Sequence, residues 1–162
     1  HMNIFVLSSD PKQCAEFHCD KHVIKMILES AQMLSTVSQL HGGSAGYKIT
    51  HQNHPCTKWV SESLSNWHWL QELTTHLNNE YKYRYNKNIN HKSHDVAKTL
   101  ITPNLPDTEL TPFAQAMPDK YKNQNVITAY RSYYINEKSN ILTWRKREVP
   151  HWIKTIYPEL YY

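Results

Sequence analysis

The sequence lacks the short motifs that mark several large enzyme classes. It contains no GxxxxGK(S/T) loop, GxGxxG turn, GxSxG elbow or HExxH helix, so nucleoside-triphosphate hydrolysis, dinucleotide redox chemistry and the familiar hydrolase mechanisms have no support. It also has no run of about 18 apolar residues, and we expect no transmembrane helix. The first apolar stretch, 3–7, is too short for a signal peptide and lacks a basic flank. We expect a short strand or an extended segment there.

Cysteine is scarce too. Cys14, Cys19 and Cys56 are the three cysteines, and none forms a CxxC pair. An odd count without regular spacing argues against a disulfide scaffold and favours a reducing compartment. We therefore expect a cytoplasmic protein, located in the host cell if the source is viral.

Histidine is more frequent, and one group of histidines raises the question of a metal. The loop 51–56, together with His18, Cys19 and His22, could supply zinc ligands, but the spacing matches no established zinc pattern. We expect neither a metal nor another cofactor. His54, directly before a proline, is expected to order its loop or to line a cleft shared with the first two histidines.

The length and composition fit one folding unit. The chain has 162 residues, 40% of them hydrophobic, and shows no internal repeat or linker. We expect a single compact, mostly α domain over residues 2–162, with irregular proline-rich loops and little or no sheet, acting as a monomer. His1 is expected to be a residue added for expression, with Met2 as the native start.

Apolar periodicity and capping residues predict the helices. Asp10-Pro11 and Asn125 are start signals, and Gly42-Gly43 is a stop signal. The predicted helices cover residues 11–18, 20–40, 55–81, 91–100 and 126–141. Four prolines between residues 103 and 119 indicate an extended loop with one helical turn near 113–117. The aromatic tail, 152–162, is expected to pack back on the core.

The helix predicted at 20–40 has one apolar side and one polar side. The residues of the polar side, which we call the polar stripe, are His18, Lys21, His22, Lys25, Glu29 and Gln32. Two imidazoles and two amines each recur one turn apart, and repulsion between two lysines can lower a lysine pKa and make it nucleophilic. Glu29, one turn beyond Lys25, could hold that amine or move protons. A solvated helix face is the alternative.

Asp20 stands apart from the polar stripe. It points to the apolar side of the helix, where an unpaired carboxylate would be costly. It either caps the helix that follows or is a buried carboxylate facing a catalytic pocket. The sequence leaves both interpretations open.

The charge of the chain is unevenly distributed. Residues 1–80 hold 5 Lys and Arg against 7 Asp and Glu, a net of −2, whereas residues 81–162 hold 13 against 7, a net of +6. Tyrosines interleave with the bases in this second half at 81–87 and at 130–138, and Trp144 directly precedes the basic residues 145–147. If 81–87 is extended, its tyrosines face one way and its bases the other. The pattern suits a nucleic acid, with core packing and an ordinary basic surface as alternatives.

Three blocks carry a family resemblance. They are Asp20-Lys21-x-x-x-Lys25-x-x-x-Glu29-x-x-Gln32-x-Leu34, then Asn53-His54-Pro55, then Tyr130-Arg131-Ser132 before a basic segment. In these blocks the chain resembles phage and bacterial proteins of the pyrimidine-dimer DNA glycosylase family, the ultraviolet-repair kind of endonuclease V. The resemblance implies a compact helical fold and a DNA glycosylase with AP-lyase activity, acting on damaged or modified pyrimidines.

The family's mechanism implies roles for these positions. An amine attacks the sugar C1′, a Schiff base forms, and β-elimination cuts the strand with the help of a helix carboxylate. Asp20 or Glu29 would be this carboxylate, with Lys21 and Lys25 as a basic clamp. Well-known members use the amine of a small residue exposed by methionine removal, but here Asn3 follows Met2 and is bulky enough that we expect Met2 to be retained. The nucleophile is then the Met2 amine, a lysine such as Lys21, or absent.

Other residues are expected to bind the DNA: His18, His22, His54, Tyr83, Arg84, Tyr130, Arg131, Arg145 and Arg147. Two other functions remain open from the sequence. One is a viral nucleotide- or base-modifying enzyme that uses the same His and Lys pocket. The other is a non-enzymatic nucleic-acid-binding protein that uses the basic, tyrosine-rich second half.

Overall fold

The regular structure of the chain is helical. The structure, a computed structural model, describes residues 2–43 and 46–154, and in these ranges all regular elements are helices. The elements are α1 (Pro11–Phe17), α2 (Asp20–Leu40), α3 (Pro55–Glu62), α4 (Leu64–Arg84), α5 (Lys92–Lys98), η1 (Asp119–Tyr121), α6 (Val126–Glu137), η2 (Ser139–Ile141) and α7 (His151–Lys154). The predicted mostly α fold is confirmed. No helix among these residues is long and apolar enough to span a membrane.

Side-chain caps explain where several helices begin. Asp10 accepts a hydrogen bond from the Gln13 amide at the start of α1, and Ser63 and Asn125 do the same for α4 and α6. Two histidines act in the same way, because Nδ1 of His54 and of His91 accepts from the amide two residues later. At the end of α2, Gly42 adopts φ +78°, a conformation that costs glycine little.

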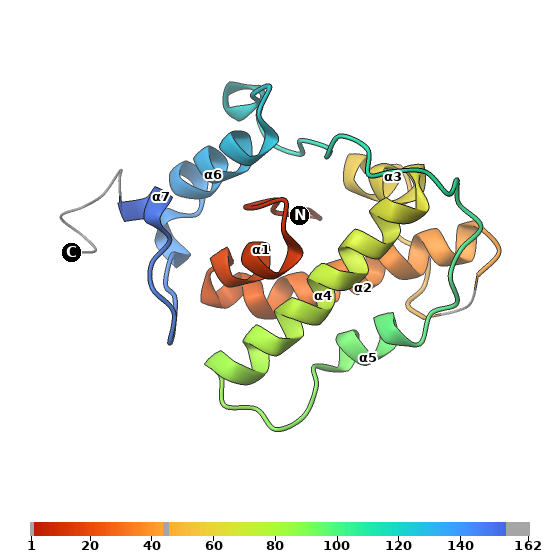
Figure 1. Cartoon of the computed structure of the whole chain (residues 1–162), viewed down its shortest axis with the longest axis horizontal. Coiled ribbons are helices and arrows are strands. Elements are labelled where there is room, and N and C mark those ends of the chain that lie inside the picture. The colour runs from red at the N-terminus through yellow and green to blue at the C-terminus, as the bar shows by residue number, and fades with distance from the viewer. Residues whose placement is uncertain (1, 44–45, 155–162) are drawn as a thin grey trace.

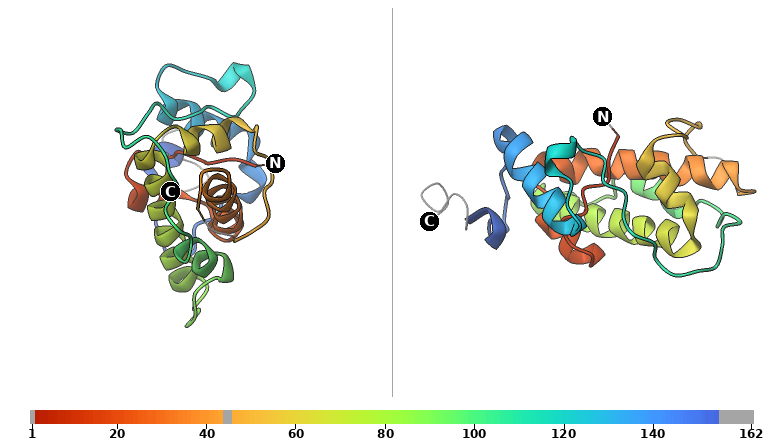
Figure 2. Two further views of the ribbon diagram at one scale, coloured as in Figure 1. Left: turned by 90° about the vertical axis from the view of Figure 1, so that its right-hand side faces the viewer. Right: turned by 90° about the horizontal axis from the view of Figure 1, so that it is seen from above.

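Helices α2 and α4, each 21 residues long, form the centre of the fold. They run side by side in opposite directions, with α1 packed on α4 and α5 packed on both (Figures 1 and 2). Trp67 of α4 donates from its indole nitrogen to the Leu34 carbonyl of α2 at 3.2 Å. Helices α6 and α7 lie at the end of the molecule where α2 begins (Figure 1).

The N-terminal segment is extended and buried. Residues 2–8 are all buried, and they form no strand with any other part of the described chain. Phe5 lies at the centre of an aromatic group with His22, Tyr130, Tyr133 and Tyr134. The segment and α6 therefore cover the side of α2 that carries the polar stripe.

Several predicted elements need correction. The helix predicted at 55–81 is two helices, because Ser63 adopts extended backbone angles and caps α4. Helix α6 ends at Glu137 and only a 3₁₀ turn continues to Ile141. Residues 113–117 form no helical turn, and the turn at η1 comes just after them. Residues 81–84 are helical, so tyrosines and bases do not alternate between two faces there.

The start of the predicted aromatic tail does pack on the core. Trp152 and Ile153 are buried, and the Arg131 guanidinium lies 5.3 Å from the Trp152 ring centre. The remainder of the predicted tail, 155–162, lies outside the described residues.

Candidate active site

Glu29 lies where the chain start meets the middle of α2. Its Oε1 accepts a hydrogen bond from the Asn3 amide at 3.0 Å, and its Oε2 lies 3.8 Å from the Lys25 Nζ. The Glu29 side chain is 9% exposed, whereas the Lys25 side chain is 57% exposed. The carboxylate is therefore held between a backbone amide of the chain start and an amine that faces solvent.

The Asn3 side chain fixes the chain start in this position. Its Oδ1 accepts from the Ile4 amide at 2.8 Å and from the Tyr130 hydroxyl at 3.2 Å, and its Nδ2 donates to the Ala116 carbonyl at 2.9 Å. The Cys56 thiol donates to the same Oδ1. Asn3 thus joins the N-terminal segment to α3, to α6 and to the proline-rich loop.

His54 brings the loop before α3 to the same place. Its Nδ1 accepts from the Cys56 amide at 3.0 Å, so the ring proton is on Nε2. Burial and nearby His51 lower the pKa of His54, and a hydrogen bond to the Met2 backbone opposes them. His51 is exposed and has φ +49°. We call Met2, Lys25, Glu29, His51 and His54 the Glu29 group.

The surroundings of Glu29 suit it to exchange protons. Burial raises the pKa of Glu29, while the Asn3 amide and the Lys25 and His51 charges oppose that rise. A buried carboxylate next to an exposed amine is suited to accept a proton and return it. No three His, Cys, Asp or Glu side chains are arranged to hold a metal ion anywhere in 2–43 or 46–154.

His18 and His22 are not on the surface, so the polar stripe is not the solvent face that its pattern suggested. Both rings are buried, because the N-terminal segment and Tyr134 cover them. His22 stacks on Phe5 with ring centres 4.5 Å apart. Burial, with weaker effects from His18, Lys138 and Lys25, lowers the pKa of His22 to about 2. Burial also lowers the pKa of His18 to about 4.

These two buried imidazoles predict a loss of stability in acid. Each is neutral in the folded chain but takes a proton near pH 6.5 when unfolded, so the unfolded chain binds more protons below that pH. The free energy of unfolding should fall by about 1.4 kcal/mol per pH unit for each ring as pH drops from 6.5 towards 4. Urea unfolding at several pH values measures this slope.

Single substitutions test the source of the slope. His22→Gln should lower the slope by about 1.4 kcal/mol per pH unit, whereas Gln32→Ala, which removes no titratable group from α2, should leave it unchanged. Equal slopes for His22→Gln and the wild type would contradict the assignment.

Asp20 belongs to a different part of the structure. It does not cap α2, because the N-cap is Cys19. It is buried, but its oxygens accept from the Arg84 guanidinium, the Thr143 hydroxyl and the Arg145 amide rather than facing a pocket. Asp20 and Glu29 are nine residues apart on α2, roughly 13 Å along the helix axis. Lys21, next to Asp20, is exposed.

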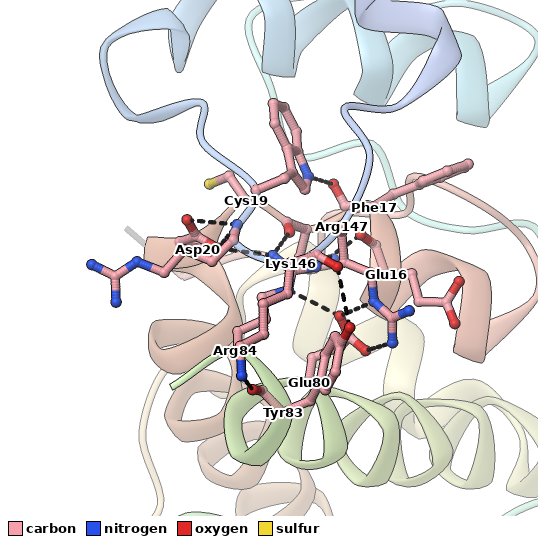
Figure 3. Close-up of polar contacts among 12 residues, drawn as sticks. Glu16, Phe17, Cys19, Asp20, Glu80, Tyr83, Arg84, Lys146 and Arg147 are labelled. Atoms are coloured by element: carbon pink, nitrogen blue, oxygen red, sulfur yellow. Dashed lines mark hydrogen bonds and ion pairs between the residues drawn. The ribbon is translucent and has the colours of Figure 1, made fainter. Parts of the chain in front are cut away.

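Two of the arginines expected to bind DNA pair with the buried carboxylate of Glu80, and one of them, Arg84, is itself buried (Figure 3). Arg84 is 2% exposed and donates to Glu80, to Asp20 and to the carbonyls of His18 and Glu16. Arg147 binds Glu80 with two hydrogen bonds, of 3.0 and 2.7 Å. Because burial and these bonds occupy its donors, Arg84 cannot contact a substrate, and that prediction is wrong for Arg84.

Some of the remaining positions predicted to bind DNA are buried in the protein, and others are exposed on its surface. Tyr130 is buried and bonds to Asn3, and Arg131 donates to the Leu7 carbonyl while stacking on Phe17. Tyr83 and Arg145 are exposed. The prediction that Tyr130 contacts substrate is therefore wrong, because its hydroxyl is enclosed.

The sequence interpretation missed Asn3 and His51 as members or supports of the site. Asn3 carried a signal that could have revealed it, because it is a polar side chain at the start of an otherwise apolar segment. His51 lay in a loop whose three-dimensional position no periodicity indicates.

The comparison with known families identifies the family of the chain. A family model described as pyrimidine dimer DNA glycosylase matches residues 2–93. The match contains the whole Glu29 group and helices α1 to α4. The searches of curated proteins and of solved structures gave no match. Since the family model covers more than half of the chain, the protein belongs to the pyrimidine dimer DNA glycosylase family.

Proposed function

We propose that the protein is a DNA glycosylase with AP-lyase activity that acts on damaged or modified pyrimidine nucleotides, and that the Glu29 group is its active site. The observation that carries this proposal is the hydrogen bond from the Asn3 amide to Glu29. In a chain that begins at Met2, that contact puts the α-amine one residue from a buried carboxylate. Family membership supplies the reaction class.

The chemistry needs only an amine and a carboxylate. The amine nitrogen attacks C1′, the bond from C1′ to the base breaks, and the base leaves with the electron pair and a proton. Opening of the sugar ring then gives an imine, and removal of a C2′ proton expels the 3′-phosphate and cuts the strand. Glu29 would stabilise the positive charge at C1′ and accept the C2′ proton.

Two amines are candidates for the nucleophile. The Met2 α-amine is the first, and Lys25 is the second, because its Nζ is exposed and lies 3.8 Å from Glu29. Lys21 is one turn further from Glu29 on α2. We favour the Met2 amine, because Asn3 holds the chain start through side-chain contacts on both sides.

Borohydride trapping on a duplex with one abasic site tests the proposal. Borohydride reduces the imine, so a reacting amine becomes covalently joined to the DNA. A chain that starts at Met2 should give the adduct, and the same chain with a blocked or extended N-terminus should lose at least 90% of it (roughly a tenfold loss or more, from removal of the nucleophile). Lys25→Ala should retain the adduct.

The contrary outcomes are distinct. Loss of the adduct in Lys25→Ala, with retention in the blocked chain, would transfer the nucleophile to Lys25. No adduct from any form would remove the lyase mechanism.

A further inference from the structure

A second group of exposed cations lies at the end of the molecule where α2 begins and α4 ends. It comprises Lys21, Lys87, Arg145 and Lys146, which we call the basic end. The backbone amide of Arg145 bonds to Asp20, next to Lys21, and Lys146 contacts Asn86, next to Lys87. Two of these cations come from residues after 93, beyond the family match.

Two acidic residues beside the basic end, Asp20 and Glu80, are buried and already neutralised, whereas Glu148 is exposed. Asp20 pairs with Arg84, and Glu80 pairs with both Arg84 and Arg147 (Figure 3). Burial opposes ionisation of Glu80, but Arg147 and Arg84 hold its pKa below the usual value. The internal charges therefore compensate one another, and the outward-facing cations keep their net positive charge.

Aromatic rings position two of the cations without neutralising them. The Arg145 guanidinium lies 4.9 Å from the Tyr85 ring centre, and the Lys146 Nζ lies 5.2 Å from the Tyr83 ring centre. The Lys146 Nζ also donates to the Tyr83 carbonyl and the Asn86 side chain, which are both uncharged. Among the described residues, no carboxylate forms an ion pair with any of the four cations. The cations are thus preorganised for an external anion.

The backbone that carries them is firmly anchored. The Asp20 amide donates to the Thr143 carbonyl at 2.9 Å, the Arg145 amide donates to Asp20, and the Trp144 indole donates to the Phe17 carbonyl at 3.0 Å. Lys146 itself has φ +60°, a conformation that a lysine adopts at a cost and that glycine or asparagine adopts more easily.

The basic end is aligned with the Glu29 group. Lys21, Lys25 and Glu29 are spaced four residues apart on α2, so they share one helix face. Lys21 and Glu29 are about 12 Å apart along the axis, which is about three nucleotides of a B-DNA strand. A strand whose nucleotide reacts at Glu29 can therefore reach the basic end.

We propose that the basic end binds phosphates of the DNA strand flanking the reacting nucleotide, and that Tyr83 and Tyr85 hold its cations ready. This inference rests on the proposed function for its ligand, and it adds a binding surface to which Arg145 and Lys146 contribute from the part of the chain beyond the family match. Arg84 and Arg147 then have a positioning role, because their hydrogen bonds to buried carboxylates hold the backbone that carries Arg145 and Lys146 in place.

The salt dependence of DNA binding tests this proposal. Fluorescence anisotropy with an undamaged duplex gives the slope of log K against log salt concentration. The double variant Arg145→Gln, Lys146→Gln should lower the magnitude of that slope by about 1.8, which is about 0.9 for each phosphate contact. The matched control Lys92→Gln, Lys98→Gln removes two exposed lysines of α5 and should keep the wild-type slope.

A second variant separates binding from folding. Lys146→Asn places a residue that tolerates φ +60° at this position, so its thermal midpoint should stay close to the wild-type value while its slope falls by about 0.9. Equal slopes for the wild type and the double variant, or an equal change in the α5 control, would overturn the proposal.

The result of the salt-dependence experiment does not depend on the result of the borohydride test. A reduced slope with no borohydride adduct from any form would retain the DNA-binding surface and remove the lyase mechanism. A normal adduct with an unchanged slope would retain the lyase mechanism and remove the DNA-binding surface.

Discussion

Replacing Glu29 with glutamine is expected to slow strand cleavage at an abasic site at least 100-fold, within the range of about 10² to 10⁴ that general acid–base groups contribute. The glutamine carbonyl can still accept the hydrogen bond from the Asn3 amide, so the chain start should keep its place. What the variant loses is the negative charge and the proton acceptor. Single-turnover cleavage of a duplex with one abasic site measures the effect, with urea unfolding as the check on folding.

Asp20→Asn is the matched control, because it makes the same chemical change nine residues earlier on the same helix. Its carboxylate pairs with Arg84 and with backbone and hydroxyl donors, so the variant should lose stability but, at a protein concentration that saturates the DNA, cleave normally per folded molecule. If Asp20→Asn abolished cleavage by folded protein and Glu29→Gln did not, Asp20 would be the catalytic carboxylate and Glu29 would have only a structural role.

The features that could be predicted from the sequence are the ones that depend on neighbours along the chain. Asp10, Asn125 and Gly42 mark helix ends through local hydrogen bonds or backbone angles, and the bounds 20–40 of α2 follow from the apolar period. Ser63 was missed because the apolar period of α3 continues into α4 without a change of phase, which hides a cap inside what looks like one helix.

The site was predicted only in part for a related reason. Helical spacing brought Lys25 and Glu29 together, and the structure keeps that pair at 3.8 Å. The burial of His18 and His22 depends on Phe5 and Tyr134, which lie outside the helix and, for Tyr134, more than 100 residues away. A helical pattern shows which residues share a face, but it does not show what covers that face.

The second large effect concerns Arg84, whose substitution by methionine is expected to destabilise the fold by about 3–5 kcal/mol, the usual cost of breaking a buried ion pair from one side. Methionine fills much of the volume but donates no hydrogen bond. Asp20 and Glu80 would stay buried without this partner, and the carbonyls of His18 and Glu16 would lose their donor. Urea unfolding at neutral pH measures the loss.

The pH dependence distinguishes lost charge compensation from lost packing. In the variant, Glu80 would lose one of the two cations that hold its pKa below the usual value, so its pKa in the folded chain would rise towards that of the unfolded chain. The part of the deficit that comes from Glu80 should therefore shrink as pH falls below about 4.3, the ordinary pKa of a glutamate. Arg131→Met is a suitable comparison, because its Nε donates to one carbonyl, that of Leu7, and its guanidinium has no acidic partner among the described residues.

A deficit for Arg84→Met that is below about 1 kcal/mol, within the range of an exposed pair, would contradict the internal role of Arg84. A deficit independent of pH would show that packing dominates.

The same variant links stability to binding, because Asp20, released from Arg84, would hold the Arg145 backbone less firmly. Its salt dependence of DNA binding should weaken while its borohydride adduct persists, since neither Glu29 nor the chain start contacts Arg84.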